Sequence, residues 1–174
     1  MTHPKIAFVD ENDRVIGAGT ILEQLQKGFF CRIIRIFLIN DKREVLMQKR
    51  SAIIPSHPNK WDQSVGGHVD EGEEYETAAY RELKEELGVE GAKLQKIAYA
   101  RAEEQNLGYT KKYFHTIYIG RYDGEVTIDP KEVAEVRWVS LDIAATWINE
   151  RPQDFTPVIP SLFAKYRSAI EAVQ

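Results

Sequence analysis

The sequence predicts an α+β fold in which a mixed central sheet lies between layers of helices. Strand-like segments dominate the chain before Gly66, one acidic helical segment follows them, and further strands precede two helical patterns at the C-terminal end. This order is typical of layered domains whose helices cover a sheet. The 174 residues, of which 43% are hydrophobic, are enough for one domain, residues 1–174, with a sizeable core.

The N-terminal segment is predicted to form a hairpin followed by a short helix. Lys5–Val9 and Arg14–Gly17 are strand-like and flank the turn-forming residues Asp10–Asp13. Ile21–Lys27 has a helical pattern. We therefore interpret residues 1–30 as an N-terminal hairpin extension, available to cover a sheet edge or to contact a second copy in a homodimer.

A second pair of strands and an irregular loop come next. Cys31–Ile39 is dense in β-branched residues, which predicts a central strand, and Glu44–Gln48 is its expected partner. Arg50–Lys60 contains two prolines and is predicted to be a loop that borders the functional site. Trp61–Val65 then leads into a glycine-rich loop that begins at Gly66.

Three strands and two helices are predicted beyond the acidic helix. The alternating segments are Ala92–Ala102, Lys112–Tyr122 and Glu135–Val139, and the helical segments are Leu141–Glu150 and a C-terminal helix within residues 156–174. The polar residues Glu103–Thr110 are expected to separate the first two of these strands. The last helix should begin near Pro157 or Pro160, because proline is tolerated in a first turn.

Charge and cysteine content exclude several classes of protein. The net charge of −4 and the pI near 5.6 give no general attraction to nucleic acid or to anionic membranes, so a phosphate-bearing ligand needs placed cations or a metal ion. Cys31 is the only cysteine, which excludes an intrachain disulfide and a cysteine-rich zinc site and fits a reducing compartment. No segment reads as a signal peptide or a membrane anchor, and we therefore expect a cytoplasmic protein.

The stretch from Gly66 to Val89 is the part of the chain that folding alone does not explain. Its helical segment carries Glu82, Glu85 and Glu86, and at about 100° per residue these carboxylates fall within an arc of about 100°. Like charges at this spacing, close to the helix end expected at Gly88, destabilise a helix. A bound divalent cation would make this cluster of carboxylates stabilising, because hard oxygen ligands suit Mg2+ or Mn2+.

The same stretch resembles the complete Nudix box, the signature of the Nudix hydrolases. Gly67 is followed after five residues by Glu73 and after seven more by Arg81–Val89, without departure from the family pattern at any defining position. The resemblance implies a Nudix-type α/β/α sandwich over most of the chain. It also implies hydrolysis of a nucleoside diphosphate linked to another moiety, a small-molecule diphosphate substrate.

The resemblance further implies roles for individual residues. Glu82, Glu85 and Glu86 would be ligands of Mg2+, with Mn2+ as an alternative, and one of them would also be a candidate base. Gly67 would place its backbone carbonyl near the metal. Arg81 would pair with Glu73 and so fix the loop against the helix.

An extra carboxylate from outside the box often acts as base or as a further metal ligand in this family. Glu135 is our candidate for this catalytic role, and Glu132, Glu103 and Glu104 are alternatives. Spacing alone leaves the choice of base open. His68 is a candidate metal or phosphate contact that could equally cap local backbone groups.

The surroundings of the box resemble the branch of the superfamily that contains isopentenyl-diphosphate isomerase. The resemblance rests on Trp61–His68 and on the early segment Asp10–Asn12. In the isomerase a catalytic cysteine occupies the position that matches Gly66, where this chain has no thiol. The additional histidine ligands of the isomerase are missing, and Lys111–Tyr118 contains no glutamate where the isomerase needs acids.

Three functions are compatible with these patterns. The intact box and the absent thiol favour metal-dependent hydrolysis of a diphosphate linkage over isomerisation of the isopentenyl-diphosphate type. A non-catalytic ligand-sensing module on the same fold is the third, and the complete set of acids argues against it. The candidate phosphate-binding cations are Arg32, Lys49, Arg50, Lys60 and Arg101, whereas His57 and His115 are expected to be structural or exposed.

Overall fold

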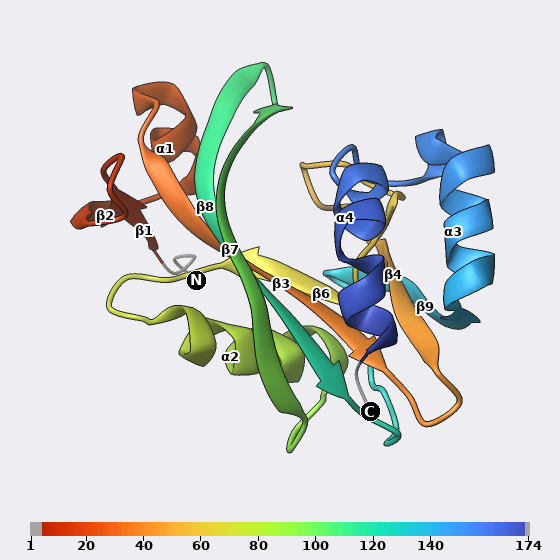
Figure 1. Cartoon of the computed structure of the whole chain (residues 1–174). Coiled ribbons are helices and arrows are strands. Elements are labelled where there is room, and N and C mark those ends of the chain that lie inside the picture. The colour runs from red at the N-terminus through yellow and green to blue at the C-terminus, as the bar shows by residue number, and fades with distance from the viewer. Residues whose placement is uncertain (1–4, 173–174) are drawn as a thin grey trace.

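The computed structural model describes residues 5–172, which form one mixed sheet of nine strands and four α-helices (Figure 1). The strands are β1 (Ile6–Val9), β2 (Val15–Gly19), β3 (Phe30–Ile39), β4 (Glu44–Arg50), β5 (Trp61–Asp62), β6 (Val65–His68), β7 (Lys93–Asn106), β8 (Tyr109–Arg121) and β9 (Val133–Ser140). The helices are α1 (Ile21–Lys27), α2 (Tyr75–Leu87), α3 (Leu141–Glu150) and α4 (Ile159–Glu171), with a 3-10 turn at Pro152–Asp154.

β3 is the centre of the sheet, as its β-branched composition predicts. Along one edge it pairs in parallel with β8 over its whole length, from Phe30 opposite Lys112 to Ile39 opposite Arg121. Along its other edge it pairs antiparallel with β1, β6 and β4 in succession. β2 extends the sheet from β1, β7 from β8, and both β5 and β9 from β4.

Helices cover both faces of the sheet because alternate residues of β3 point to opposite sides. Ile34, Ile36 and Leu38 pack with the buried face of α2. Phe37 and Ile39 pack with buried residues of α3 and α4. The predicted α/β/α sandwich with a mixed central sheet is therefore confirmed (Figure 1).

Helix ends follow the predicted signals. Gly88 ends α2 in the left-handed conformation, with φ of 63°, and its N–H donates to the carbonyl of Lys84 at 3.0 Å. Pro160 lies in the first turn of α4, as expected for a residue without an amide hydrogen. No helix within residues 5–172 has the length and apolar character needed to cross a membrane.

The N-terminal hairpin is joined to the sheet and to α2. Asp13, in the turn between β1 and β2, accepts from Arg32 Nε at 2.6 Å and from the hydroxyls of Tyr75 and Tyr99 at 3.0 and 2.8 Å. Since β1 also pairs with β3, this part of the predicted extension belongs to the sheet. Residues 1–4 of that extension, and residues 173–174 of the C-terminal segment, lie outside the described residues.

Two local predictions are wrong. The polar segment Glu103–Thr110 does not separate two strands, because β7 and β8 continue through it and turn only at Leu107 and Gly108. Both of these residues have positive φ, 51° and 81°, as a tight two-residue hairpin requires. Likewise the glycine pair Gly66 and Gly67 lies within β6, antiparallel to β3, and not in a loop.

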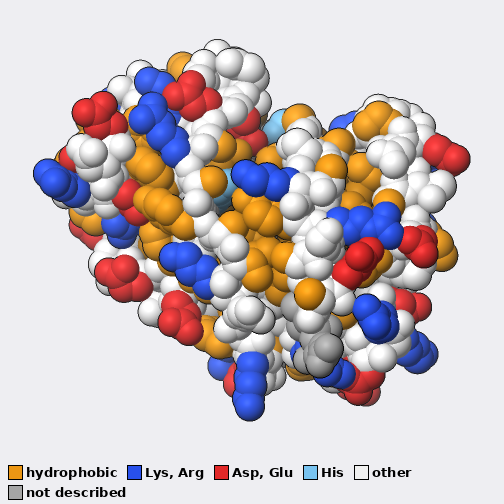
Figure 2. Space-filling model, in the orientation of Figure 1, with side chains coloured by type: hydrophobic (Ala, Val, Ile, Leu, Met, Phe, Trp, Pro, Cys, Tyr) orange, Lys and Arg blue, Asp and Glu red, His pale blue; other side chains and the backbone are white. Residues whose placement is uncertain are grey.

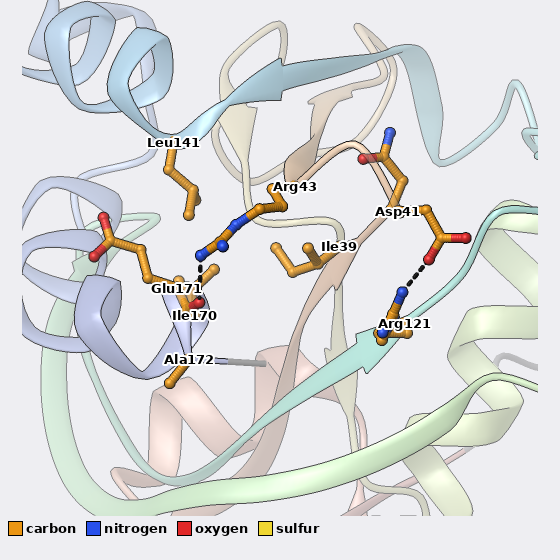
Figure 3. Close-up of a pocket in the computed structure, with 9 residues that line it drawn as sticks. Ile39, Asp41, Arg43, Arg121, Leu141, Ile170, Glu171 and Ala172 are labelled. Atoms are coloured by element: carbon orange, nitrogen blue, oxygen red, sulfur yellow. Dashed lines mark hydrogen bonds and ion pairs between the residues drawn. The ribbon is translucent and has the colours of Figure 1, made fainter. Parts of the chain in front are cut away.

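The molecular surface is hollowed between two lobes, one containing the β7–β8 hairpin and the other α3 and α4 (Figure 2). A separate pocket lies at the carboxyl end of β3, beside the end of α4 (Figure 3). Its two arginines are engaged, because Arg43 donates to the carbonyl of Glu171 at 3.0 Å and Arg121 pairs with Asp41. This pocket contains no residue of the Nudix-like stretch.

Shortening the side chain of Leu83 tests the packing of α2 on the sheet. Leu83 is 1% exposed, so Leu83→Ala should lower the free energy of unfolding by about 2–5 kcal/mol in urea denaturation. Lys84→Ala is the matched control on the same helix; its ion pair with Glu90 is exposed, and the change should stay within about 0.5 kcal/mol. Similar losses in the two variants would contradict this packing.

Candidate active site

The three helical carboxylates run from solvent into the protein interior. The side chain of Glu85 is 58% exposed, that of Glu82 is 14% exposed, and Glu86 is 6% exposed. This order follows their positions around the helix, where Glu82 lies between the other two. The predicted acidic face of α2 is therefore not a solvated surface, because two of its three acids are largely removed from water.

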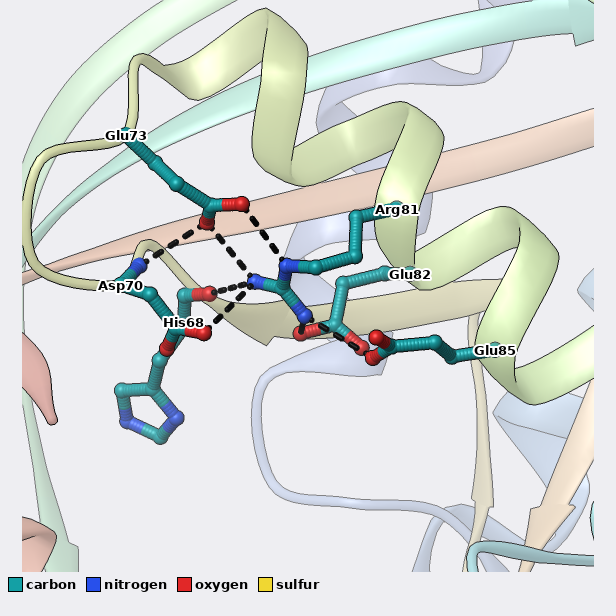
Figure 4. Close-up of polar contacts among 6 residues, drawn as sticks. All are labelled: His68, Asp70, Glu73, Arg81, Glu82 and Glu85. Atoms are coloured by element: carbon teal, nitrogen blue, oxygen red, sulfur yellow. Dashed lines mark hydrogen bonds and ion pairs between the residues drawn. The ribbon is translucent and has the colours of Figure 1, made fainter. Parts of the chain in front are cut away.

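A single guanidinium holds the acidic helix to the preceding loop and strand (Figure 4). Arg81 donates from Nε and Nη2 to the two carboxylate oxygens of Glu73, both at 2.9 Å, which confirms the predicted pair. Its Nη1 donates to Glu82 at 2.9 Å and to Glu85 at 3.0 Å, and its Nη2 also donates to the carbonyl of His68 at 3.0 Å. These contacts raise the pKa of Arg81 against the effect of burial.

Gly67 is required because Glu82 occupies the space beside it. A Cβ atom at position 67 would overlap the carboxyl group of Glu82 and would lie 2.7 Å from its Cγ. Glycine is therefore needed at position 67 so that α2 can approach β6 closely, and not because the backbone turns there. This contact brings the carboxyl group of Glu82 directly against the backbone of β6.

Burial raises the pKa of both inner carboxyl groups. It raises the pKa of Glu82 to about 7, although the Arg81 guanidinium opposes the shift. Burial, and then the charge of Glu82, raise the pKa of Glu86 well above its ordinary value. Its hydrogen bond from Gln48 Nε2, at 2.5 Å, only partly offsets these effects.

Carboxylate oxygens are suitable ligands for a divalent cation, but the three carboxylates of α2 do not converge on one position. Within residues 5–172 no three acidic, histidine or cysteine side chains are arranged to hold a metal ion. Arg81 holds Glu82 and Glu85, whereas Glu86 turns toward Gln48. The buried, insufficiently neutralised oxygens of Glu82 and Glu86 are nevertheless the hard donors that Mg2+ prefers.

The extra carboxylate favoured by the sequence does not join this group. Glu135 lies opposite Lys49 in the β4–β9 ladder, so it faces away from Gln48 and Glu86, and Arg137 donates to it at 2.6 Å. Glu132 is the acid from this region whose charge acts on Glu86. The sequence alone does not fix which side chains of β9 face α2, and this orientation favours Glu132 over Glu135.

Of the two alternatives for His115, structural or exposed, the structure shows a buried side chain on β8. His68 lies in β6. Among the described residues, neither Nε2 of His68 nor Nδ1 of His115 has a hydrogen-bond partner, and both atoms are buried. Burial and neighbouring cations lower the pKa of His68, and burial lowers the pKa of His115 to about 4. Both imidazoles are therefore neutral near pH 7.

Comparison with known proteins identifies the family. The NUDIX domain model matches residues 30–159, and the chain therefore belongs to the Nudix family. It is 34% identical over 153 residues to isopentenyl-diphosphate Delta-isomerase 2 of Photorhabdus laumondii, covering 87% of this chain and 85% of that one. It is 30% identical over 139 residues to an uncharacterized Nudix hydrolase of Pseudomonas aeruginosa, covering 80% of each chain.

The fold is also that of a solved structure. The crystal structure of DR0079 from Deinococcus radiodurans superposes with a TM-score of 0.77 at 23% identity, covering 92% of this chain and 98% of that one. The predicted family and the likeness to the isomerase branch are thus confirmed. The chain is an enzyme of the class that hydrolyses phosphoric anhydride bonds.

Replacing Arg81 with lysine tests the guanidinium network. An ammonium group cannot donate in parallel to both oxygens of Glu73 while also reaching Glu82 and the carbonyl of His68. Arg81→Lys should therefore lower the free energy of unfolding by about 2–4 kcal/mol in urea denaturation. Arg137→Lys, in an exposed ion pair, should change the free energy of unfolding by no more than about 0.5 kcal/mol. Equal losses in the two variants would show that the Arg81 network stabilises the fold no more than an exposed ion pair does.

Proposed function

We propose that this protein is a metal-dependent hydrolase that cleaves the diphosphate linkage of a small nucleoside-diphosphate-linked substrate. Glu82, Glu85 and Glu86, with the carbonyl of Gly67, are the proposed ligands of Mg2+, and Mn2+ is the alternative. The observation that carries this proposal is the burial of Glu82 and Glu86 side by side on α2, which raises the pKa of both carboxyl groups and which a bound cation would offset. Family membership supports it further.

When bound, such a cation neutralises phosphate charge and makes a coordinated water more acidic. The residues of the chain prepare that site. Arg81 fixes the loop that contains Glu73 against α2 and holds the backbone of β6 beside the acids. Gln48 orients one oxygen of Glu86, and the missing side chain of Gly67 leaves room for Glu82.

The residue that removes a proton from the attacking water is proposed among the acids near this site. Glu85 and Glu86 are the candidates from the helix. Glu132 replaces Glu135 as the candidate from outside it, because its charge acts on Glu86 whereas Glu135 is paired with Arg137 on the other face of the sheet.

Glu86→Gln tests the catalytic proposal. In a magnesium-dependent screen of nucleotide sugars, dinucleotides, coenzyme A, oxidised nucleotides and prenyl diphosphates, scored by chromatography of the cleavage products, the variant should lower kcat at least about 100-fold. Glu76→Gln, at an exposed position of the same helix, is the control and should keep kcat within about two-fold of wild type. Equal turnover by wild type and Glu86→Gln would rule the mechanism out.

Metal binding is tested separately from turnover. A cation that binds only the folded protein raises its Tm. Wild type should therefore gain thermal stability when Mg2+ is added after EDTA treatment, and Glu86→Gln should gain much less, in scanning fluorimetry. An unchanged Mg2+ response in the variant would remove Glu86 from the ligand set.

Isomerisation is the competing activity, because the isomerase of Photorhabdus laumondii is among the relatives. The chain has no thiol at Gly66, and Cys31 is buried, with a pKa raised to about 11. Formation of dimethylallyl diphosphate from isopentenyl diphosphate, without release of phosphate or pyrophosphate, would favour that activity. Tight binding of one diphosphate with no turnover of any would favour a sensor.

A further inference from the structure

β6 separates two groups of charged residues. Gly67 lies opposite Ile34, so it shares the face that packs on α2 and its acids. Gly66 and His68 lie opposite Arg35 and Ile33, and their side of the strand belongs to the other face of the sheet. This second face carries basic and neutral donor groups where the first carries carboxylates.

The basic group, which we call the cation cluster, consists of Arg35 from β3 and Lys111 from β8. These side chains are 6% and 5% exposed, and each cation lies 5.8 Å from the ring centroid of Tyr113. The ring of His115 contacts Tyr113 edge-on, at a centroid distance of 5.5 Å. His68 lies opposite Ile33 of β3, and Ile33 in turn lies opposite His115 of β8, so the two histidines share this face of the sheet.

The cation cluster lacks the partners that buried charges normally have. Arg35 donates from Nη1 to the amide oxygen of Gln63 at 3.0 Å, a neutral acceptor, and its Nε has no partner among residues 5–172. Lys111 forms no hydrogen bond or ion pair through its side chain within the described part of the chain, and burial lowers its pKa. Glu104 lies opposite Lys111 on β7, and its charge raises the pKa of Lys111. Within residues 5–172 the two side chains do not form a salt bridge.

The cation cluster and the acidic site lie around the same region. Gly67 of β6 lies against the carboxyl group of Glu82, and its neighbour Gly66 lies opposite Arg35. The two groups are therefore separated by the width of one strand. Histidine side chains, pale blue in Figure 2, are visible in the hollow between the two lobes.

We propose that the cation cluster binds a phosphoryl group of the substrate that is separate from the diphosphate being cleaved. The inference rests on the proposed function and names the substrate class, a nucleoside-diphosphate-linked molecule that carries an additional phosphomonoester. The guanidinium fork of Arg35, the ammonium group of Lys111 and the imidazoles of His68 and His115, each with a buried ring nitrogen that has no partner among residues 5–172, supply polar groups that suit an oxygen-rich dianion. β6 would keep this phosphoryl group apart from the diphosphate at the proposed metal site of Glu82 and Glu86.

Phosphate binding tests the cation cluster without requiring turnover. Inorganic phosphate is titrated into the full-length protein in EDTA, and binding is followed by calorimetry. Lys111→Met should weaken binding at least about ten-fold, the loss expected for one charge-assisted hydrogen bond. Lys112→Met removes the same charge from the opposite face of β8, and its affinity for phosphate should stay within about two-fold of wild type. The phosphate affinity of Glu86→Gln should also stay within about two-fold.

The stability of the variant separates binding from a structural role. Methionine replaces an unpaired buried charge with an apolar chain of similar length, so Lys111→Met should keep or raise the Tm of wild type. A lower Tm with unchanged phosphate affinity would make Lys111 a structural residue and overturn the proposal. Arg35→Gln provides a second variant with the same expected loss of phosphate affinity. Absence of saturable phosphate binding by wild type would also overturn it.

Paired substrates distinguish this inference from the proposed hydrolysis. Coenzyme A and NADP differ from dephospho-coenzyme A and NAD by one phosphomonoester, and kcat/KM is measured for each pair. Wild type should prefer the phosphorylated member of a pair at least about ten-fold, and Lys111→Met should abolish the preference without lowering kcat/KM for the other member. Turnover without any such preference contradicts only the cation-cluster proposal. No turnover of any diphosphate, with phosphate binding lost in Lys111→Met, contradicts only the hydrolysis.

Discussion

The arrangement of the acidic site depends on one guanidinium. Arg81 joins three parts of the chain, since it binds Glu73 in the loop, the carbonyl of His68 in β6 and two acids of α2. A planar group with five donors can satisfy this geometry, whereas a point charge cannot. Burial outweighs its single positive charge, so the pKa of Glu82 is raised in spite of Arg81, and burial also raises the pKa of Glu86.

The sheet uses both faces of one short strand to keep opposite charges apart. Acids approach β6 from the α2 side, where Gly67 leaves them room, and the cation cluster occupies the other side with His68. Removing either group of charges from water costs free energy. The opposite charges of the other group do not offset this cost through direct ion pairs, because the backbone of β6 lies between them. A ligand with two separate centres of phosphate charge, one of them associated with a cation, would reduce both costs together.

The sequence predicts the local part of this site and not the part built by strand register. Pairing of Arg81 with Glu73 and the end of α2 at Gly88 depend on residues close in the chain, and both are confirmed. Lys111 is not among the cations that the sequence suggests, and only the pairing of β8 with β3 places it, and not Lys112, on the face of Arg35. In the same way, only the pairing of β4 with β9 shows that Glu135 faces away from Gln48.

The position of the isomerase cysteine is connected to the cation cluster through one amide. A Cβ atom at Gly66 would overlap Nε2 of Gln63, and the oxygen of the same amide accepts from Arg35. Any side chain at position 66 would therefore require Gln63 to shift, and with it the acceptor of the Arg35 guanidinium. Gly66 thus does more than lack a thiol: its empty side allows Gln63 to orient Arg35, so a cysteine introduced there would disturb the cation cluster before it could supply isomerase chemistry.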